Sequence, residues 1–259
     1  MYLVIGLGPI GGGAGARLAE LGRPVCGLDL DERRAREWSE KTGAPAVTDM
    51  GGIEWPAIDT VIIAVRMADQ VRSTMESLVA GSGGKPLTVY VLTTLSIADA
   101  TAICSGAPEN WRLFEAPVSG GAGGAREGTM TVFLAGPPRE EADEALLSDI
   151  AGKVFGTDEY GAPAVLKLTN NALGALNAVS TAHMLRIAAR NGVAPATFLD
   201  VVGASSGQSW MSDHFTVFPD DLLFKDAGLL RDDLGSLPVI DLDLDPAAEI
   251  AAARELLGP

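Results

Sequence analysis

Cysteine and aromatic residues are scarce in this chain of 259 residues. Phe, Trp and Tyr together make up 5% of it, so a folded core has to be built mainly from Ala, Val, Leu and Ile. The two cysteines, Cys26 and Cys104, lie in or beside apolar stretches and lack the spacing of metal ligands. The sequence therefore predicts two buried thiols in a reducing compartment and no cysteine-ligated metal.

A basic patch and a long apolar run are also missing. The formal net charge is −15, and the densest basic run, residues 33–36, is interleaved with acids. Such an acidic body repels nucleic acid and anionic lipid. No apolar run approaches the ~18 residues of a membrane-spanning helix, and no basic segment precedes the first apolar strand. We therefore expect a soluble, cytoplasmic protein without a nucleic-acid or membrane partner.

The first part of the chain alternates short β-rich runs with helical stretches. Hydrophobic residues make up 47% and charged residues 20%, a globular composition. This alternation predicts a doubly wound parallel sheet with helices on both faces, which is an α/β fold. Strands are expected at residues 2–5, 24–28, 60–64, 88–92 and 131–135, and helices at residues 10–21 and 31–42.

The pattern changes after Gly156. One long segment, residues 163–191, is rich in Ala, Leu and Val and predicts a helix of roughly 40 Å. A helix that is apolar on most faces is buried, either in the centre of a domain or between subunits, and we expect a homodimer or homotetramer. Shorter helices are expected at residues 195–202, 210–215, 222–234 and 246–257. We therefore place a first domain at residues 1–157 and an all-α domain at residues 158–259.

A glycine-rich turn follows the first expected strand and opens a helix. It reads G-x-G-x-x-G over Gly6, Leu7, Gly8, Pro9, Ile10 and Gly11. The first glycine permits a tight turn, the second lets the backbone approach a pyrophosphate, and the third lets the helix pack on the strand. The helix N-terminus supplies free N–H groups for that anion. The motif predicts a Rossmann-type dinucleotide site, and the alternative is a structural turn.

Asp29 lies at the end of the second expected strand, 23 residues after Gly6. A carboxylate at this place accepts hydrogen bonds from the adenosine ribose hydroxyls. Leu30 follows, where a basic side chain would be expected if a 2′-phosphate had to be bound. These two residues favour NAD over NADP.

Four further segments, in this order, carry a family resemblance. They are residues 115–121 (Glu-Ala-Pro-Val-Ser-Gly-Gly), 128–136 (Gly-Thr-Met-Thr-Val-Phe-Leu-Ala-Gly), 167–171 (Lys-Leu-Thr-Asn-Asn) and the pair Lys225-Asp226. This succession resembles the β-hydroxyacid dehydrogenases, also called the 3-hydroxyisobutyrate dehydrogenase family. The resemblance extends from Met1 to about Leu230. It implies a nicotinamide-dependent oxidoreductase that acts on a small anionic substrate.

The resemblance also implies roles for the substrate site. Ser119, Gly120 and Gly121 would bind the acid group of the substrate, whether carboxylate, phosphonate or sulfonate, and Asn170 is assigned to the same site. Lys167 would be the general acid/base, since an ammonium near the start of an apolar helix is unfavourable unless it is paired or used. Asn171 shares its helical face and would orient the substrate or the amine.

Other residues are implied to contact the cofactor. Val65 and Arg66 follow the third expected strand, and Arg66 departs from the family pattern. Its cation would either approach the ribose or pyrophosphate or face solvent. Gln70, Thr94 and Lys225 complete the cofactor set.

Two departures from the family pattern concern the helical part. Gly161-Ala162-Pro163 replaces the usual Gly-x-Gly before the lysine, and proline is tolerated there because no N–H is needed in the first helical turn. After Asp226 the family continues with further helices, whereas this chain has an acidic stretch, so we expect a shortened all-α domain. The preferred function is reversible NAD-linked oxidation of a small β-hydroxyacid or reduction of the aldehyde acid. The alternatives are an imine reductase-like enzyme, although that class generally lacks the lysine, and a non-catalytic NAD-binding protein.

Overall fold

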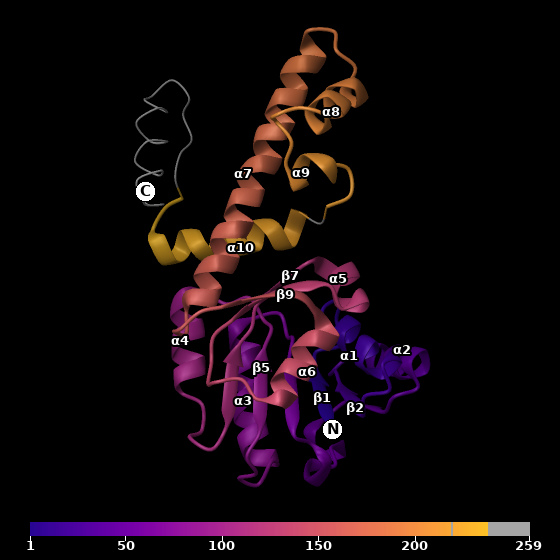
Figure 1. Cartoon of the computed structure of the whole chain (residues 1–259), viewed down its shortest axis with the longest axis vertical. Coiled ribbons are helices and arrows are strands. Elements are labelled where there is room, and N and C mark those ends of the chain that lie inside the picture. Colours follow the sequence, from indigo (N-terminus) through magenta and orange to yellow (C-terminus); the bar gives the residue numbers. More distant parts are fainter. Residues whose placement is uncertain (219, 238–259) are drawn as a thin grey trace.

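A computed structural model describes residues 1–218 and 220–237. Figure 1 shows an α/β unit from which one long helix rises, with short helices along the upper part of that helix and another helix across its lower part. The helix expected at residues 246–257 lies outside the described residues. None of the described helices combines the length and the apolar character needed to cross a bilayer.

The α/β unit is built on a six-stranded parallel sheet of order β3-β2-β1-β4-β5-β6. The central strands are buried on both faces, as is usual in parallel sheets, and Val4, Ile62 and Val89 have no exposed surface. Because both of their faces are buried, the central strands are continuous apolar runs in the sequence. The strands are β1 (Tyr2–Ile5), β2 (Val25–Leu28), β3 (Ala46–Val47), β4 (Thr60–Ile63), β5 (Thr88–Val91) and β6 (Arg112–Glu115).

Helices cover both faces of this sheet, as predicted. One hydrophobic core lies between the sheet and helices α3 and α4, and a second lies between the sheet and helices α1, α2, α5 and α6. The helices are α1 (Gly11–Glu20), α2 (Glu32–Thr42), α3 (Ala68–Gly81), α4 (Ile97–Ser105), α5 (Gly121–Glu127) and α6 (Glu141–Ile150), with two short 3-10 helices at Met50–Gly52 and Trp55–Ala57.

The strand expected at residues 131–135 does not join the parallel sheet. It is β8 (Met130–Leu134), the centre of a second, three-stranded sheet, where it runs antiparallel to β7 (Val118–Ser119) and parallel to β9 (Ala151–Gly156). Only about ten residues connect β7 to β8, and a parallel crossover requires a dozen or more. The chain therefore turns back through α5, and a single bridge between Glu115 and Ala135 joins the two sheets.

The long helix α7 (Ala162–Arg190) begins at the carboxyl end of the sheet, the end opposite to the N-terminus (Figure 1). Its lower part is covered by α10 (Asp220–Leu234), which crosses it and packs Ala227 and Leu230 against Leu168, Ala172 and Ala175. Two short helices, α8 (Pro195–Gly203) and α9 (Trp210–Asp213), lie along the upper part. Apolar side chains of this upper part, including Met184 and Ile187, are exposed in the single chain, so of the two kinds of burial that the sequence predicts, within a domain or between subunits, it is the second that would cover them.

Candidate active site

The glycine-rich turn joins β1 to α1 at the carboxyl end of the sheet. Gly6 has φ +89°, and a Cβ atom there would lie 2.7 Å from the carbonyl oxygen of Ala64. A Cβ on Gly11 would lie 2.1 Å from the carbonyl oxygen of Gly6, because the helix packs directly on the turn. Gly8 differs from both, since nothing lies within 4 Å of its Cβ position. The backbone of Gly8 is thus open to a ligand, and a pyrophosphate fits this cradle.

Asp29 stands beside the turn, at the end of β2, and is buried. Its Oδ2 accepts a hydrogen bond from the N–H of Leu7 (2.8 Å) and its Oδ1 from the N–H of Asp31 (3.0 Å). The Arg34 guanidinium lies 3.1 Å from both oxygens, and the hydrogen bond with Asp29 raises the pKa of Arg34. Leu30 is 82% exposed. Arg34 is a cation close to the expected ribose site that the sequence reasoning did not identify.

The cofactor residues expected after β4 and β5 lie at the carboxyl ends of these strands, at the same end of the sheet as the glycine-rich turn. The Thr93 hydroxyl donates a hydrogen bond to the carbonyl oxygen of Val65 (2.7 Å), which joins the ends of the two strands. Gln70 uses its side-chain oxygen to accept from the N–H groups of Arg66 and Met67, both at 3.0 Å. This oxygen therefore caps the first turn of α3. Thr94 follows Thr93 and is half-buried.

The expected acid-binding segment lies between β7 and α5. Ser119 ends β7, opposite Thr131 of β8, and is half-buried. Gly120 and Gly121 are exposed and have φ +120° and φ +62°, a backbone conformation that favours glycine. Each residue of this segment is small, and its backbone is accessible to a ligand. Asn170 is exposed on α7 and donates to the Asn171 side-chain oxygen (3.2 Å).

Lys167 is 7% exposed, although it carries an ammonium group. Its Nζ donates to Oδ1 of Asn171 (3.2 Å) and lies 4.0 Å from Oδ2 of Asp226. The Asn171 amide in turn donates to the same carboxylate oxygen at 2.7 Å. Burial lowers the pKa of Lys167, and the Asp226 carboxylate partly opposes this shift while Lys225 adds to it. An amine of this kind exchanges a proton nearer to neutral pH than an exposed lysine does.

Asp226 is a member of this cluster whose role the sequence reasoning did not assign. It lies on α10, is 5% exposed, and also pairs with the Lys225 ammonium through Oδ1 at 3.0 Å. The Lys225-Asp226 pair was the available signal, but the separation of 55 residues from Asn171 hides the contact. Helices α7 and α10 together therefore place two ammonium groups and one amide around a single buried carboxylate.

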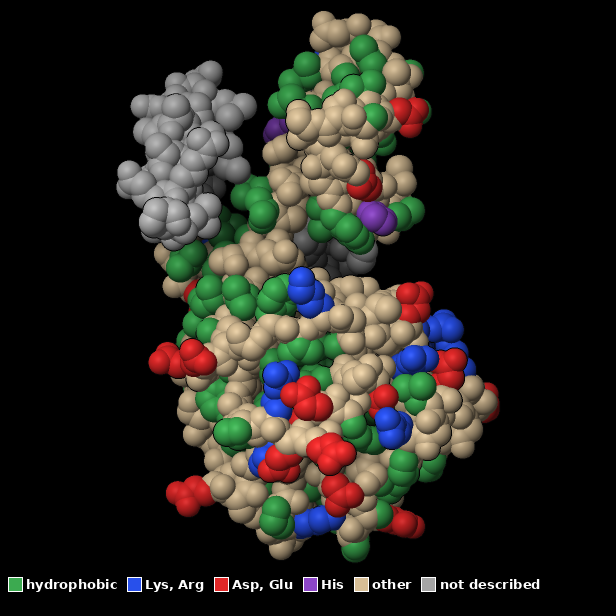
Figure 2. Space-filling view, viewed as in Figure 1, with side chains coloured by type: hydrophobic (Ala, Val, Ile, Leu, Met, Phe, Trp, Pro, Cys, Tyr) green, Lys and Arg blue, Asp and Glu red, His purple; other side chains and the backbone are tan. Residues whose placement is uncertain are grey.

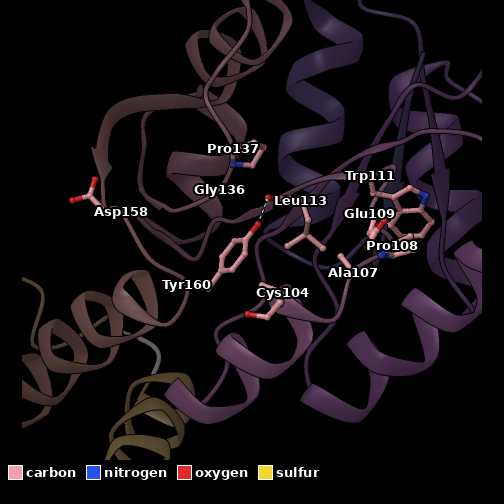
Figure 3. Close-up of a pocket in the computed structure, with 11 residues that line it drawn as sticks. Cys104, Ala107, Pro108, Glu109, Trp111, Leu113, Gly136, Pro137, Asp158 and Tyr160 are labelled. Atoms are coloured by element: carbon pink, nitrogen blue, oxygen red, sulfur yellow. Dashed lines mark hydrogen bonds between the residues drawn. The ribbon is translucent and has the colours of Figure 1, made fainter.

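A cavity of about 420 Å³ opens along β6 and contains none of the predicted site residues. Figure 3 shows Tyr160 crossing it and donating its hydroxyl to the carbonyl oxygen of Leu113, at 2.8 Å. Cys104, Pro108 and Trp111 line the opposite side. Polar groups do not converge here as they do around Lys167, so we place the candidate active site at the glycine turn and the Lys167 cluster.

The fold and these residues define an NAD(P)-dependent dehydrogenase. Residues 2–157 match the family model for the NAD binding domain of 6-phosphogluconate dehydrogenase. Residues 161–235 match the model described as NAD-binding of NADP-dependent 3-hydroxyisobutyrate dehydrogenase. The chain belongs to the β-hydroxyacid dehydrogenase family, as the resemblance predicted.

Relatives and solved structures agree with this assignment. A 3-hydroxyisobutyrate dehydrogenase of Pseudomonas aeruginosa is 30% identical over 83% of this chain and 73% of its own length. An L-threonate dehydrogenase of Haemophilus influenzae is 30% identical over 90% of this chain and 82% of its own length. The crystal structure of 3-hydroxyisobutyrate dehydrogenase from Salmonella typhimurium superposes with a TM-score of 0.76 at 28% identity, covering 92% of this chain and 88% of that one. An imine reductase of Streptomyces aurantiacus shares the fold, with a TM-score of 0.66 at 21% identity over 99% and 85% of the two chains.

Proposed function

We propose that this protein catalyses the reversible oxidation of a small β-hydroxyacid with NAD, and that Lys167 transfers the proton. The observation that carries the proposal is the buried Lys167 ammonium, which is held by Asn171 and faces Asp226. A buried amine with a lowered pKa, in a chain that also carries a dinucleotide-binding turn, is suited to general acid/base chemistry. Within the proposal, residues 1–157 bind the cofactor and residues 158–259 complete the substrate site.

The nicotinamide ring, when bound, accepts or donates the hydride. The residues of this chain bind the cofactor, orient the amine and transfer the proton. In the direction of oxidation, neutral Lys167 takes the proton from the substrate hydroxyl as the carbonyl forms, and in reduction the ammonium returns it. Asn171 holds the amine through its side-chain oxygen, and Asp226 fixes Asn171 through the 2.7 Å hydrogen bond. The turn at Gly6 to Gly11 and Asp29 hold the cofactor.

Ser119, Gly120 and Gly121 are proposed to bind the acid group. The molecule as a whole repels anions because its net charge is −15. A substrate anion therefore depends on the local N–H and hydroxyl donors of this segment.

The function is tested by following nicotinamide absorbance with a panel of small hydroxyacids and simple alcohols. The panel includes 3-hydroxyisobutyrate and L-threonate, which the names of the relatives suggest. We expect turnover of at least one hydroxyacid and none of alcohols that lack an acid group. Turnover of cyclic imines but of no hydroxyacid would instead support an imine reductase, and NAD binding without any turnover would support a non-catalytic protein.

NAD is expected to be preferred to NADP. The Asp29 carboxylate would repel a 2′-phosphate and leave it unpaired, which disfavours NADP by at least ~1–3 kcal/mol, or roughly 5–150-fold in kcat/KM. Replacing Asp29 with Asn should narrow this preference, because Arg34 is then released to meet the phosphate. Asp49→Asn, which changes a carboxylate that caps the 3-10 helix at Met50–Gly52, is the matched control. Equal turnover of both cofactors by the wild type would overturn the role of Asp29.

The protein is expected to be a homodimer or homotetramer. Leu173, Met184 and Ile187 on α7 are 47–57% exposed, and Figure 2 shows hydrophobic side chains gathered over this upper part of the molecule. Exposed apolar patches of this kind mark subunit contacts. The double variant Met184→Glu, Ile187→Glu should become monomeric by light scattering. Val79→Glu makes the same change at an exposed apolar residue on α3 and should not. A monomeric wild type at micromolar concentration would contradict the prediction.

A further inference from the structure

Glu115 is a buried carboxylate that the chemistry above does not use. It ends β6, is 2% exposed, and burial raises its pKa against the lowering effect of its two backbone hydrogen bonds. Both oxygens accept from the first turn of α7. Oε2 accepts from the N–H of Gly161 at 2.6 Å, and Oε1 accepts from the N–H of Ala164 at 2.8 Å.

These two donors are the N-cap residue of α7 and the third residue of the helix. An N-cap side chain usually accepts from that third N–H, but Gly161 has no side chain to do so. Its φ of +91° favours glycine, and a Cβ atom there would lie 2.5 Å from the Thr101 hydroxyl. Glu115 therefore supplies from the sheet the cap that the helix does not supply for itself. Its negative charge also suits the positive end of the helix dipole.

Lys167 lies three residues after Ala164, on the same face of the helix and about 4.5 Å further along its axis. Two hydrogen bonds to one carboxylate oppose both rotation of α7 about its axis and displacement along it. The sheet that Glu115 belongs to also carries the glycine turn at the end of β1. Glu115 is thus a short, charged connection between the part of the chain that would hold the cofactor and the helix that carries the amine.

We propose that Glu115 is the positioning residue for Lys167, fixing the first turn of α7 on the sheet so that the amine meets the reacting oxygen. The inference rests on the proposed function of Lys167. A displacement of about 1 Å at a reacting group is enough to lower a rate by about 100-fold. Glu115→Gln retains the shape of the side chain but places an amide NH₂ against one of the two N–H donors, so the turn has to move.

The test compares single-turnover NADH formation in four proteins, with whichever of 3-hydroxyisobutyrate and L-threonate is turned over. They are the wild type, Glu115→Gln, Lys167→Ala and the double variant. We expect Glu115→Gln to lower the rate at saturating NAD and substrate by about 10–100-fold, with the NAD dissociation constant changed less than about two-fold. In the Lys167→Ala background the same change should alter the rate by less than about two-fold, because the two residues act as one unit.

Tyr160→Phe is the matched control. It removes the adjacent hydrogen bond to Leu113 (Figure 3) and should lower the melting temperature while leaving the single-turnover rate within about two-fold of wild type. In the protein without cofactor, hydrogen exchange at the Ala164 amide should accelerate in Glu115→Gln and not in Tyr160→Phe.

An unchanged rate in Glu115→Gln, or the same fold loss with and without Lys167, would overturn the inference and leave Glu115 a structural cap. If Glu115→Gln fails to bind NAD, the four-protein comparison is repeated with Glu115→Asp, whose carboxylate is one methylene shorter. An unchanged rate, or the same fold loss with and without Lys167, would again overturn the inference. A Lys167→Ala protein with the wild-type rate would instead overturn the proposed function itself.

Discussion

Replacing Lys167 with alanine is expected to lower kcat by about 10²–10⁴-fold, the usual contribution of a positioned general acid or base, with NAD affinity nearly unchanged. The oxygen that gains or loses a proton needs a partner within hydrogen-bond reach. Among the residues of the candidate site, Lys167 combines burial, a lowered pKa and an amide that holds its amine. The effect should therefore fall on kcat, measured with saturating NAD and substrate where chemistry is rate-limiting.

Two variants of other residues on α7 serve as comparisons for Lys167→Ala. Asn171→Ala should lower kcat less than Lys167→Ala does, because Asn171 orients the amine and transfers no proton. Thr169→Ala changes an exposed residue whose hydroxyl bonds only to the helix backbone, and its kcat should remain that of the wild type. Retention of more than about a tenth of wild-type kcat by Lys167→Ala would show that another group transfers the proton.

The second large effect is expected from Asp226→Asn. The carboxylate raises the pKa of Lys167 against the effect of burial, so its removal should lower that pKa further. In oxidation the amine acts in its neutral form, and the limb of the pH profile of kcat/KM that reports it should move to lower pH. The free energy of unfolding should also fall by about 3 kcal/mol, because removing one partner of a buried ionic cluster leaves the others uncompensated.

The pH dependence of the free energy of unfolding provides a second test of the coupling between Asp226 and Lys167. The folded-state pKa of Lys167 is lowered, so its contribution to stability is fully present above the unfolded-state pKa and is lost as pH falls through the folded-state value. Asp226→Asn lowers the folded-state value and should therefore destabilise the protein more at neutral pH, where Lys167 is an ammonium opposite an ionised carboxylate in the wild type, than at alkaline pH, where the amine is neutral. Urea unfolding of both proteins across pH measures this. A destabilisation that does not depend on pH, together with an unshifted activity limb, would contradict the coupling of Asp226 to Lys167.

The parts of the fold that sequence could predict are those with local patterns. Strands β1, β2, β4 and β5 are continuous apolar runs because both of their faces are buried. Strand β6 was missed because it begins and ends with charged residues, whose partners come from distant segments. Arg112 pairs with Glu140 and Asp143, and Glu115 caps α7. Strand β9 was missed because glycine and lysine weaken its pattern.

In the candidate site, too, some features follow from local sequence patterns and others from contacts between distant segments. The glycine turn and the Lys167 motif are short segments whose chemistry depends on neighbours in sequence. The pairing of Asp226 with Asn171 and the capping of α7 by Glu115 join segments 55 and 46–49 residues apart, and no local pattern reports such contacts. The Arg34–Asp29 pair spans only five residues, but it depends on the direction in which α2 leaves β2.

The most direct test of the central claim is the pH dependence of single-turnover NADH formation in the wild type and in Lys167→Ala. The wild-type rate should rise with pH through an ionisation below the usual lysine value of about 10.4, as the amine loses its proton. The variant should be slower by about 10²–10⁴-fold and should lack this ionisation. The same limb in both proteins would contradict the account, because the titrating group that drives the reaction would then not be Lys167.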